Sequence, residues 1–302
     1  IGLSVVVFFP LISAFVITLI PKAQEQLIKR FALASSLITF VLSAILLFQF
    51  DFSSAEKLQL GNKISWIKSI NANYEIGIDG ISLPLLVLST FITVLAIIYS
   101  LEHLPEPKSP KGFLALILVL ETGMNGTFVA LDLILFFVFF EIVLLPMYFM
   151  IGIWGDKTVR TVSGFKNQIE TRLYASIKFF VFTLFGSAFM LLGFLGLYYR
   201  GNKTFSIPEL IELGTSGAFT GTFATLVFAV LFLGFAVKVP MWPLHTWLPD
   251  AHTAAPTVGS VLLAAILLKL GSYGFVRIAI PILPEQAKAW APAIAILSAI
   301  GI

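Results

Sequence analysis

The sequence predicts an all-α integral membrane protein, a polytopic bundle of helices that cross the bilayer. Of its 302 residues, 58% are hydrophobic and only 12% are charged, whereas soluble domains carry about 25% charged residues. Thirty phenylalanines accompany apolar runs of about 18–26 residues, which match a bilayer-crossing helix and exceed a barrel strand. These observations exclude an ordinary water-soluble enzyme.

Nine apolar runs supply the transmembrane elements in order. Polar segments at 51–79 and 155–172 separate some of them, and the second carries no recognisable motif. Because no soluble linker divides the chain, we expect one membrane domain. The ninth run begins near Trp290 and is still apolar at Ile302, so we expect the chain to stop inside a helix. The other spans are predicted at residues 3–20, 31–50, 80–101, 112–131, 133–154, 174–199, 222–247 and 256–280.

The charge and cysteine content exclude several functions. The net charge of +3 is small for this length and is typical of polar loops, not of a nucleic-acid-binding face. Cysteine is absent from the sequence, which excludes disulfides, thiolate zinc sites, iron–sulfur clusters and a cysteine nucleophile. Three well-separated histidines cannot supply paired haem ligands, so we expect no metal or redox centre in this chain.

The distribution of positive charge predicts the orientation. The loops that contain Pro21, Pro105 and Gly155 hold ten of the nineteen Lys and Arg residues, and the opposite loops hold seven. Loops rich in Lys and Arg stay on the cytoplasmic side. The bias favours a cytoplasmic first loop and an N-terminus outside.

Two lysines and two glutamates remain inside the apolar runs. Glu141, Lys238 and Lys269 fall at similar depths near the middle of their spans, and Glu121 lies in the run LALILVLETGMNG. A charge at the bilayer centre costs about 2.5–3.5 kcal/mol on insertion scales, so such residues are functional candidates. A buried lysine changes its proton affinity when a carboxylate approaches or leaves, which suits a proton-loading site. The alternative is a buried Glu141–Lys238 pair that only fixes helix packing.

The depths of these residues predict their contacts. We expect Glu141 and Lys238 to approach within direct or one-water contact, because either charge alone is costly at that depth. Lys269 has no such partner in its own span. We therefore expect it to face the protein interior, toward Lys238, through His245 or water.

Three prolines interrupt the seventh span, which contains the run KVPMWPLHTWLPDAH. Each proline removes an N–H donor and frees the carbonyl four residues earlier, so we expect a break between Lys238 and Leu244. Transporters place ion sites at such breaks. His245 suits a proton relay because imidazole titrates near neutral pH, and it equally suits an interfacial histidine bonded to a freed carbonyl. His252 is expected at the interface.

Four stretches of the sequence carry a family resemblance. The longest, residues 238–274, reads KVPMWPLHTWLPDAHTAAPTVGSVLLAAILLKLGSYG. The others read GIDGISLPLLVLS at 77–89, ALDLILFFVFFEIVLLPMYFMIGIWG at 130–155 and RLYASIKFFVFTLFGSAFMLLG at 172–193. Together they resemble the proton-translocating antiporter-like subunits of respiratory complex I, NADH:quinone oxidoreductase. Within that family they are similar to the subunit M, or chain 4, branch.

The resemblance implies a fold of fourteen helices with two inverted five-helix repeats, each of which contains one broken helix. On this pattern, residues 1–111 hold three N-terminal membrane helices and residues 112–280 form the first antiporter-like repeat. Residues 281–302 begin a second repeat, which is truncated. About nine of the fourteen spans are then present.

The same resemblance implies roles for four residues. Glu141 matches the fifth-helix glutamate that pairs with a lysine, and Lys238 matches the broken-helix lysine that loads the proton. His245 matches a histidine of the connecting relay. Lys269 matches the central lysine that passes the proton toward the second half.

By resemblance, the chain is a proton-translocating subunit of NADH:quinone oxidoreductase, driven by quinone reduction in other subunits. It is expected to hold no cofactor, because FMN, iron–sulfur clusters and quinone belong to partner subunits. Its expected partners are the lipid bilayer and other membrane subunits, including neighbouring antiporter-like ones, and no nucleic acid. The expected location is a bacterial plasma membrane, with the inner mitochondrial or thylakoid membrane as alternatives.

Other functions share these motifs. The chain could serve a multi-subunit Na+/H+ antiporter, a membrane-bound hydrogenase or the photosynthetic ferredoxin–plastoquinone complex. A purely structural membrane scaffold is a further alternative, and it predicts that Lys238 and Lys269 tolerate neutral replacement.

Overall fold

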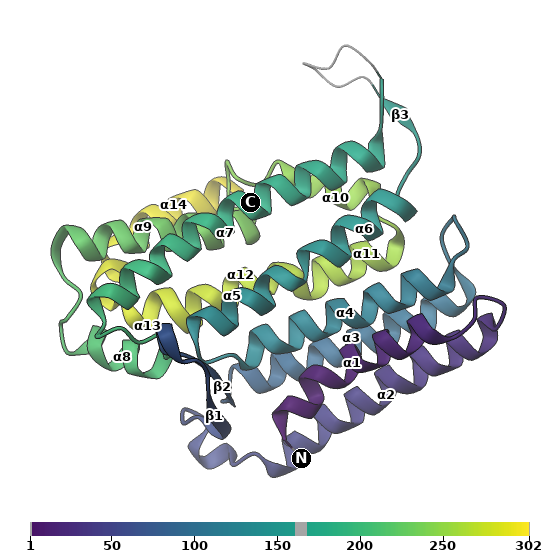
Figure 1. The fold of residues 1–302 in the computed structure, drawn as a ribbon. Helices are drawn as coiled ribbons and strands as arrows, with labels where there is room; N and C mark the ends of the chain where they lie inside the picture. Colours follow the sequence, from purple (N-terminus) through teal and green to yellow (C-terminus); the bar gives the residue numbers. More distant parts are fainter. Residues whose placement is uncertain (1, 161–167, 302) are drawn as a thin grey trace.

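The computed structural model describes residues 2–160 and 168–301, and it is mostly helical (Figure 1). In the described residues, seven helical spans are long and apolar enough to cross a membrane. Before them lies α1 (Leu3–Leu19), an apolar helix of 17 residues that we count as the first span. The seven long spans follow as the second to the eighth: α2 (Glu25–Gln49), α3 (Ser82–Glu102), α4 (Pro110–Val129), the fifth span at Leu133–Trp154, α7 (Thr171–Arg200), α9 (Gly221–Lys238) and the eighth span at Thr257–Ile282. The expected ninth run corresponds to α14 (Pro284–Gly301).

Two of the spans are not regular helices. The fifth consists of α5 (Leu133–Ile142) and α6 (Leu144–Trp154), with a turn at Val143. The eighth alternates α-helical pieces with two π-helical turns, which shift the faces that follow them. Its parts are α11 (Thr257–Leu262), η3 (Leu263–Leu267), α12 (Leu268–Gly274), η4 (Phe275–Ala279) and α13 (Ile280–Ile282). Two further short helices are α8 (Ile207–Thr215) and α10 (Trp247–Ala254).

The expectation of an all-α fold is wrong for the polar segment 51–79, which forms a β-hairpin. After a 3₁₀ turn, η1 (Phe52–Ser54), strand β1 (Gln59–Ile67) pairs antiparallel with β2 (Ala72–Ile78). The turn between the strands contains η2 (Lys68–Ile70) and then Asn71 at φ +53°, a left-handed conformation that asparagine tolerates.

The polar segment 155–172 also contains strand pairing. Its described part forms a two-residue ladder between β3 (Val159–Arg160) and β4 (Ile169–Glu170). Residues 161–167 lie outside the described residues. The sequence offered no motif for this segment, and the ladder continues directly into α7.

Helices α1 to α4 pack against one another as a four-helix bundle (Figure 1). Hydroxyl and amide side chains cross its interior. The hydroxyls of Ser43 on α2 and Thr90 on α3 lie 2.7 Å apart, and Ser89 on α3 donates to Asn125 on α4 at 2.9 Å. Small polar residues allow helices in a membrane to approach closely and to exchange such hydrogen bonds.

Glycines bring α7 and α9 into close contact. A Cβ atom at Gly186 would lie 2.8 Å from Cβ of Val237, and one at Gly234 would lie 2.7 Å from Cβ of Met190. Real Cβ atoms do not approach so closely, so the two helices can meet only where a side chain is missing. This packing fixes the C-terminal end of α9 against α7.

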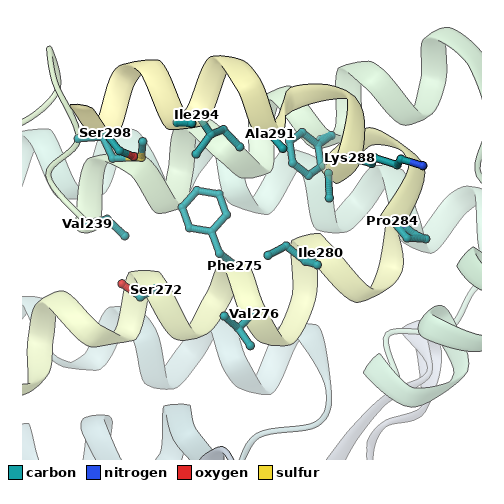
Figure 2. Close-up of a pocket in the computed structure, with 14 residues that line it drawn as sticks. Val239, Ser272, Phe275, Val276, Ile280, Pro284, Lys288, Ala291, Ile294 and Ser298 are labelled. Atoms are coloured by element: carbon teal, nitrogen blue, oxygen red, sulfur yellow. The ribbon is translucent and has the colours of Figure 1, made fainter. Parts of the chain in front are cut away.

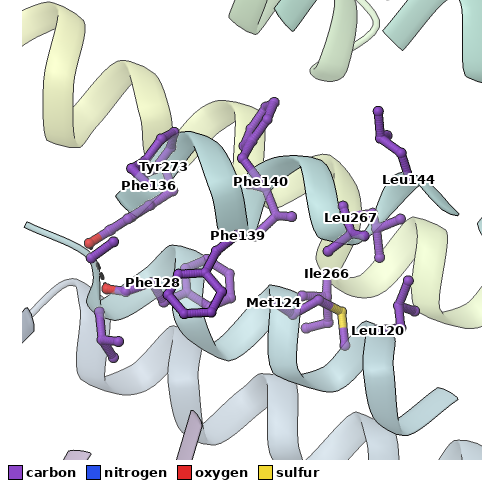
Figure 3. Close-up of a cluster of buried hydrophobic side chains, with 14 of the residues drawn as sticks. Leu120, Met124, Phe128, Phe136, Phe139, Phe140, Leu144, Ile266, Leu267 and Tyr273 are labelled. Atoms are coloured by element: carbon purple, nitrogen blue, oxygen red, sulfur yellow. Dashed lines mark hydrogen bonds between the residues drawn. The ribbon is translucent and has the colours of Figure 1, made fainter. Parts of the chain in front are cut away.

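Apolar side chains fill the space between α4, α5 and the eighth span (Figure 3). Because lipid is as apolar as these side chains, close packing stabilises the cluster more than exclusion from water does. One polar contact joins it, from the Tyr273 hydroxyl to the Phe128 carbonyl at 2.8 Å. The labelled members are Leu120, Met124, Phe128, Phe136, Phe139, Phe140, Leu144, Ile266, Leu267 and Tyr273.

Contacts near the ends of the helices define the two ends of the molecule. At one end, which we call the lysine-rich end, the ammonium groups of Lys29 and Lys111 donate to the carbonyls of Leu101 and Ile20. At the opposite end, β2 meets the chain between α4 and α5, where the Leu131 N–H donates to a β2 carbonyl at 2.8 Å. The loops that contain Pro21 and Pro105 therefore share the lysine-rich end.

Candidate functional site

The expected break in the seventh span is confirmed. Helix α9 ends at Lys238, α10 begins at Trp247, and residues 239–246 form turns between them. The carbonyl freed by Pro240 belongs to Ala236, and it accepts the Met241 N–H at 2.9 Å. The Trp247 indole N–H donates to the carbonyl of residue 237 at 2.9 Å, which holds the two half-helices together.

Lys238 is buried at the break, with 3% of its surface exposed. Its Nζ lies 4.5 Å from the centre of the Phe140 ring, a cation–π contact. In the described part of the chain, Nζ has no hydrogen-bond partner. The last residue of an α-helix also lies at the negative end of the helix dipole, which favours a positive charge there.

Glu141 lies next to Phe140, one residue before α5 ends. Pro146 removes the N–H that would bond the carbonyl of Ile142, which explains the turn at Val143. Ser187 on α7 lies beside the Glu141 carboxyl. Among the described residues, Oε1 of Glu141 is buried without a hydrogen-bond partner. The sequence placed the glutamate but did not predict this irregular turn.

The two charges interact but do not touch. Glu141 and Lys238 influence each other electrostatically across the site. Of the ion pairs within 4.0 Å that the described residues form, none joins them. The direct contact that we expected is therefore not formed, and contact through one water stays a prediction.

Gly271 on α12 makes room for Lys238. A Cβ atom there would lie 3.0 Å from Cβ of Lys238 and 2.9 Å from a methyl of Val239. The buried lysine thus sits where α9 packs against α12, with its ammonium group over Phe140 of α5.

The expected position of Lys269 is wrong for the described part of the chain. Lys269 is exposed, and its Nζ donates to the Ala264 carbonyl at 2.6 Å. Two residues along a helix correspond to a rotation of about 200°, so Lys269 points away when Gly271 faces Lys238. The carbonyl it binds lies within η3, the π-helical turn.

His245 lies in the loop of the break and is half-buried. In the residues described, its Nδ1 is buried without a hydrogen-bond partner, while its carbonyl accepts the Leu248 N–H at 2.9 Å. His252 lies on α10 and is half-buried. The seven-residue spacing from Lys238 therefore does not stack these side chains on one continuous helix.

Sequence reasoning missed three ion pairs, formed by two aspartates, that anchor the broken and eighth spans. Asp250 on α10 accepts from Arg160 at 2.9 Å and from Lys178 at 2.8 Å. Asp79, before α3, accepts Nη2 of Arg277 on both carboxylate oxygens at 2.7 Å. Their partners are separated by 72 or more residues, so no local sequence pattern reveals them.

The pKa values of two carboxyls outside the spans reflect their surroundings. Burial opposes ionisation of Asp79, but Arg277 and two backbone N–H groups outweigh it, so the pKa of Asp79 is lowered. Burial raises the pKa of Asp132 against three backbone N–H donors. Two of these donors, Ile134 and Leu135, belong to the first turn of α5, so Asp132 caps the helix that carries Glu141.

A groove of about 710 Å³ lies beside the break, between α9, the eighth span and α14 (Figure 2). Val239, which follows Lys238 directly, and Met241 form one wall. The residues that line it are mainly apolar, and none of those described is acidic. The groove therefore brings no acidic side chain toward Lys238 from this side.

The architecture defines a multi-pass integral membrane protein with a buried lysine at a broken helix. Residues 130–302 match the family described as NADH:quinone oxidoreductase/Mrp antiporter, TM. Residues 6–127 match NADH-ubiquinone oxidoreductase chain 4, amino terminus. The chain belongs to this family of antiporter-like membrane subunits of complex I, in its subunit M, or chain 4, branch.

Relatives in bacteria and plants agree with this assignment. NADH-quinone oxidoreductase subunit M of Rickettsia bellii is 40% identical over 99% of this chain and 58% of its own length. Subunit M of Rhodobacter capsulatus is also 40% identical, over 99% of this chain and 57% of its own. NADH-ubiquinone oxidoreductase chain 4 of Marchantia polymorpha is 38% identical over 100% of this chain and 57% of its own length. The chain thus spans less than two thirds of the length of these relatives.

Solved structures share the fold. A chain of respiratory complex I from Thermus thermophilus superimposes with a TM-score of 0.80 at 26% identity, over 99% of this chain and 57% of that one. A chain of an archaeal membrane-bound sulfane sulfur reductase has a TM-score of 0.78 at 23% identity, over 97% of this chain and 56% of that one. A chain of the Mrp complex from Dietzia sp. has a TM-score of 0.76 at 18% identity, over 94% of this chain and 29% of that one. At such identities, the last two indicate the fold alone.

Proposed function

We propose that this chain translocates protons as a membrane subunit of NADH:quinone oxidoreductase. Lys238 is the group that loads the proton, and Glu141 is the charge that tunes its affinity. His245 relays the proton away from the break, and Lys269 takes it onward. Quinone reduction in other subunits drives the cycle.

One observation carries the proposal: the buried Lys238 and the half-buried Glu141, whose Oε1 has no partner among the described residues, lie at the same interior site without forming an ion pair. A fixed structural pair would be expected in direct contact, because desolvated charges are stabilised only by close, well-bonded geometry. At an effective dielectric constant near 20, unit charges 4–7 Å apart interact by about 2–4 kcal/mol. A change in their separation or charge can therefore load or release a proton.

The secondary structure around the pair supports a relay. Lys238 lies at the end of a helix, His245 lies in the loop that follows, and both have buried nitrogen atoms without partners in the described residues. Such nitrogens suit water-mediated transfer, since the loop frees backbone carbonyls that can bind water. The Lys269 side chain is exposed on the side of α12 that faces away from Lys238. Its proposed role is therefore to pass the proton onward from this repeat.

We further propose the organisation that the family resemblance implies. Residues 1–111 supply N-terminal helices, 112–280 the first proton-translocating repeat, and 281–302 the start of a second within a fourteen-helix plan. FMN, iron–sulfur clusters and quinone reside in partner subunits, which include neighbouring antiporter-like subunits. The membrane is a bacterial plasma membrane, with the N-terminus outside.

A subunit of a Na+/H+ antiporter is the second candidate, because the matching family also includes Mrp antiporters. Purification of the intact complex from its native membrane distinguishes the candidates. Flavin- and quinone-binding subunits should accompany the chain if the proposal is right. Hydrogenase subunits, or neither kind of subunit, would contradict it.

Coupled transport provides the functional test. In the complete complex reconstituted into vesicles, Glu141→Gln should abolish most quinone-dependent proton uptake, since the neutral amide cannot tune Lys238. Glu141→Asp should retain part of it. Normal proton uptake by the glutamine variant would contradict the proposed role.

A further inference from the structure

A second buried acid lies outside the site described above. Glu121, near the middle of α4, has no exposed surface. In the described residues, neither of its carboxylate oxygens has a hydrogen-bond partner, and no ion pair includes it. An isolated ionised carboxylate in an apolar interior costs tens of kcal/mol, so burial without a cation favours the neutral acid.

The packing of α4 separates Glu121 from the Glu141 site. A Cβ atom at Gly123 would touch the side chains of Ile142 and Val143, so this face of α4 meets the turn between α5 and α6. Glu121 lies two residues earlier, about 200° around the helix. It therefore faces the four-helix bundle of α1 to α4.

Hydrogen bonds fix the level of Glu121 in that bundle. Asn125, one turn further along α4, accepts from Ser89 on α3 at 2.9 Å. Its amide also donates to the Val6 carbonyl on α1 at 3.5 Å, which is the carbonyl that Pro10 leaves free. Asn125 thus lies on the face of α4 that points into the bundle. Glu121, four residues earlier, lies on the same face.

Hydroxyl groups continue from this level toward the lysine-rich end. The Ser43–Thr90 contact aligns α2 with α3, which places Thr39 at about the level of Glu121 and Ser35 one turn further on. The Ser35 hydroxyl is also buried without a partner in the described residues. Other buried hydroxyls on this side belong to Ser13, Ser36, Thr93 and Ser100. Beyond Asn125, toward the opposite end, buried apolar side chains close the interior: Leu3, Leu46, Leu83 and Leu86.

Few titratable groups face this interior. Helix α1 has none, while α2 has Glu25, Lys29 and Arg30 near its start and α3 has Tyr99 and Glu102 near its end, all toward the lysine-rich end. The elements on the other faces of α4 carry Tyr74 and Glu75 of β2, Glu141 of α5, Tyr148 of α6, and Lys269 and Tyr273 of α12. The closest cation along α4 itself, Lys111, lies ten residues away, about 15 Å along the axis.

We infer that Glu121 is a second proton-binding site, occupied by a proton and reached through the hydroxyl groups of the α1–α4 bundle from the lysine-rich end. The bound proton makes the acid neutral, and its hydroxyl can donate to a water between Glu121 and the hydroxyl groups of the bundle. Because apolar residues close the other end, the site exchanges protons with one side. It does not feed Lys238 directly.

Infrared spectroscopy of the complete complex tests the inference. A protonated carboxylic acid gives a carbonyl stretch above the amide region, which moves to lower frequency when deuterium replaces the proton. We expect Glu121→Gln to remove one such band at neutral pH, and Glu121→Asp to shift it. The exposed Glu106→Gln is the control and should leave the band unchanged. An unchanged spectrum in Glu121→Gln would overturn the inference.

Access is tested by the rate of exchange in heavy water. Ser35→Val should slow the deuterium shift of the Glu121 band, whereas Leu83→Val, at the apolar end, should not. A band that never shifts in the native complex, or one that shifts equally fast in both variants, would overturn the proposed route. These outcomes do not depend on Lys238, so failure here is distinguishable from failure of the proposed function.

Discussion

At the residue scale, the ionisable residues inside the spans follow from the sequence more reliably than the directions of their side chains do. Glu141, Lys238 and Glu121 stand out because ionisable groups in apolar runs are rare and costly. Lys269 satisfies the same criterion, yet its side chain leaves the described bundle. A π-helical turn precedes Lys269 and inserts an extra residue, which rotates the faces of the helix that follows. Hydropathy does not reveal such a turn, so the sequence does not predict the direction of the Lys269 side chain.

The proposed onward relay makes Lys269 a sensitive position. Lys269→Ala should lower proton pumping, and the quinone reductase activity coupled to it, by about 100-fold, the lower range for a positioned proton-transfer group. Lys269→Arg should not restore full activity, because arginine stays protonated and cannot release its proton. Vesicle proton uptake measures both, with assembly checked by native electrophoresis. An alanine variant that pumps normally would remove Lys269 from the relay.

The position of Lys238 should depend on the missing side chain at Gly271. Gly271→Ala adds a methyl 3.0 Å from Cβ of Lys238, so we expect a destabilisation of about 1–3 kcal/mol and reduced pumping. Gly259→Ala, in the same span, is the matched control, because its nearest neighbour would lie at an ordinary 3.5 Å. Thermal unfolding and proton uptake of the complex measure the two effects. Equal behaviour of the two variants would contradict the account of the site.

At the element scale, the sequence predicted the spans and the break but not the β-hairpin or the turn at Val143. Long apolar runs predict the spans and clustered prolines predict the break, because both features depend on residues that are neighbours in the sequence. The hairpin at 59–78 is polar and carries two register shifts, so its alternation is obscured. The ion pair between Asp79 and Arg277 joins residues 198 positions apart, which no local pattern contains.

That ion pair should make stability depend on pH. The folded-state pKa of Asp79 lies below its ordinary value of 3.8, so ionised Asp79 stabilises the fold above that value. This stabilisation disappears as the pH falls through the folded-state pKa. Asp79→Asn should therefore cost about 3–5 kcal/mol at neutral pH, by leaving Arg277 unpaired, and should weaken the acid sensitivity.

Thermal unfolding of the solubilised complex at several acidic and neutral pH values measures this effect. The exposed Glu106→Gln should change stability by no more than about 0.5 kcal/mol. If Asp79→Asn and the native protein lost stability in parallel on acidification, Asp79 would not be the group responsible.

At the scale of the whole molecule, the uneven positive charge predicts how the chain sits in the membrane. Residues 1–302 contain no cysteine, so a single cysteine introduced there is the one position in this part of the protein that a maleimide can label. Lys57→Cys, in the polar segment before β1, should react with an impermeant maleimide added outside intact cells. Lys22→Cys, between α1 and α2, should react only after the membrane is opened. The reverse pattern would show that the N-terminus lies inside.

The central claim is that Lys238 loads the proton that this subunit moves. The ratio of protons pumped to electrons transferred, measured for Lys238→Ala in the complete complex in sealed vesicles, tests it most directly. We predict a clear fall in that ratio in an assembled complex, while Lys57→Ala, an exposed lysine, retains the native value. A native ratio in Lys238→Ala would contradict the account.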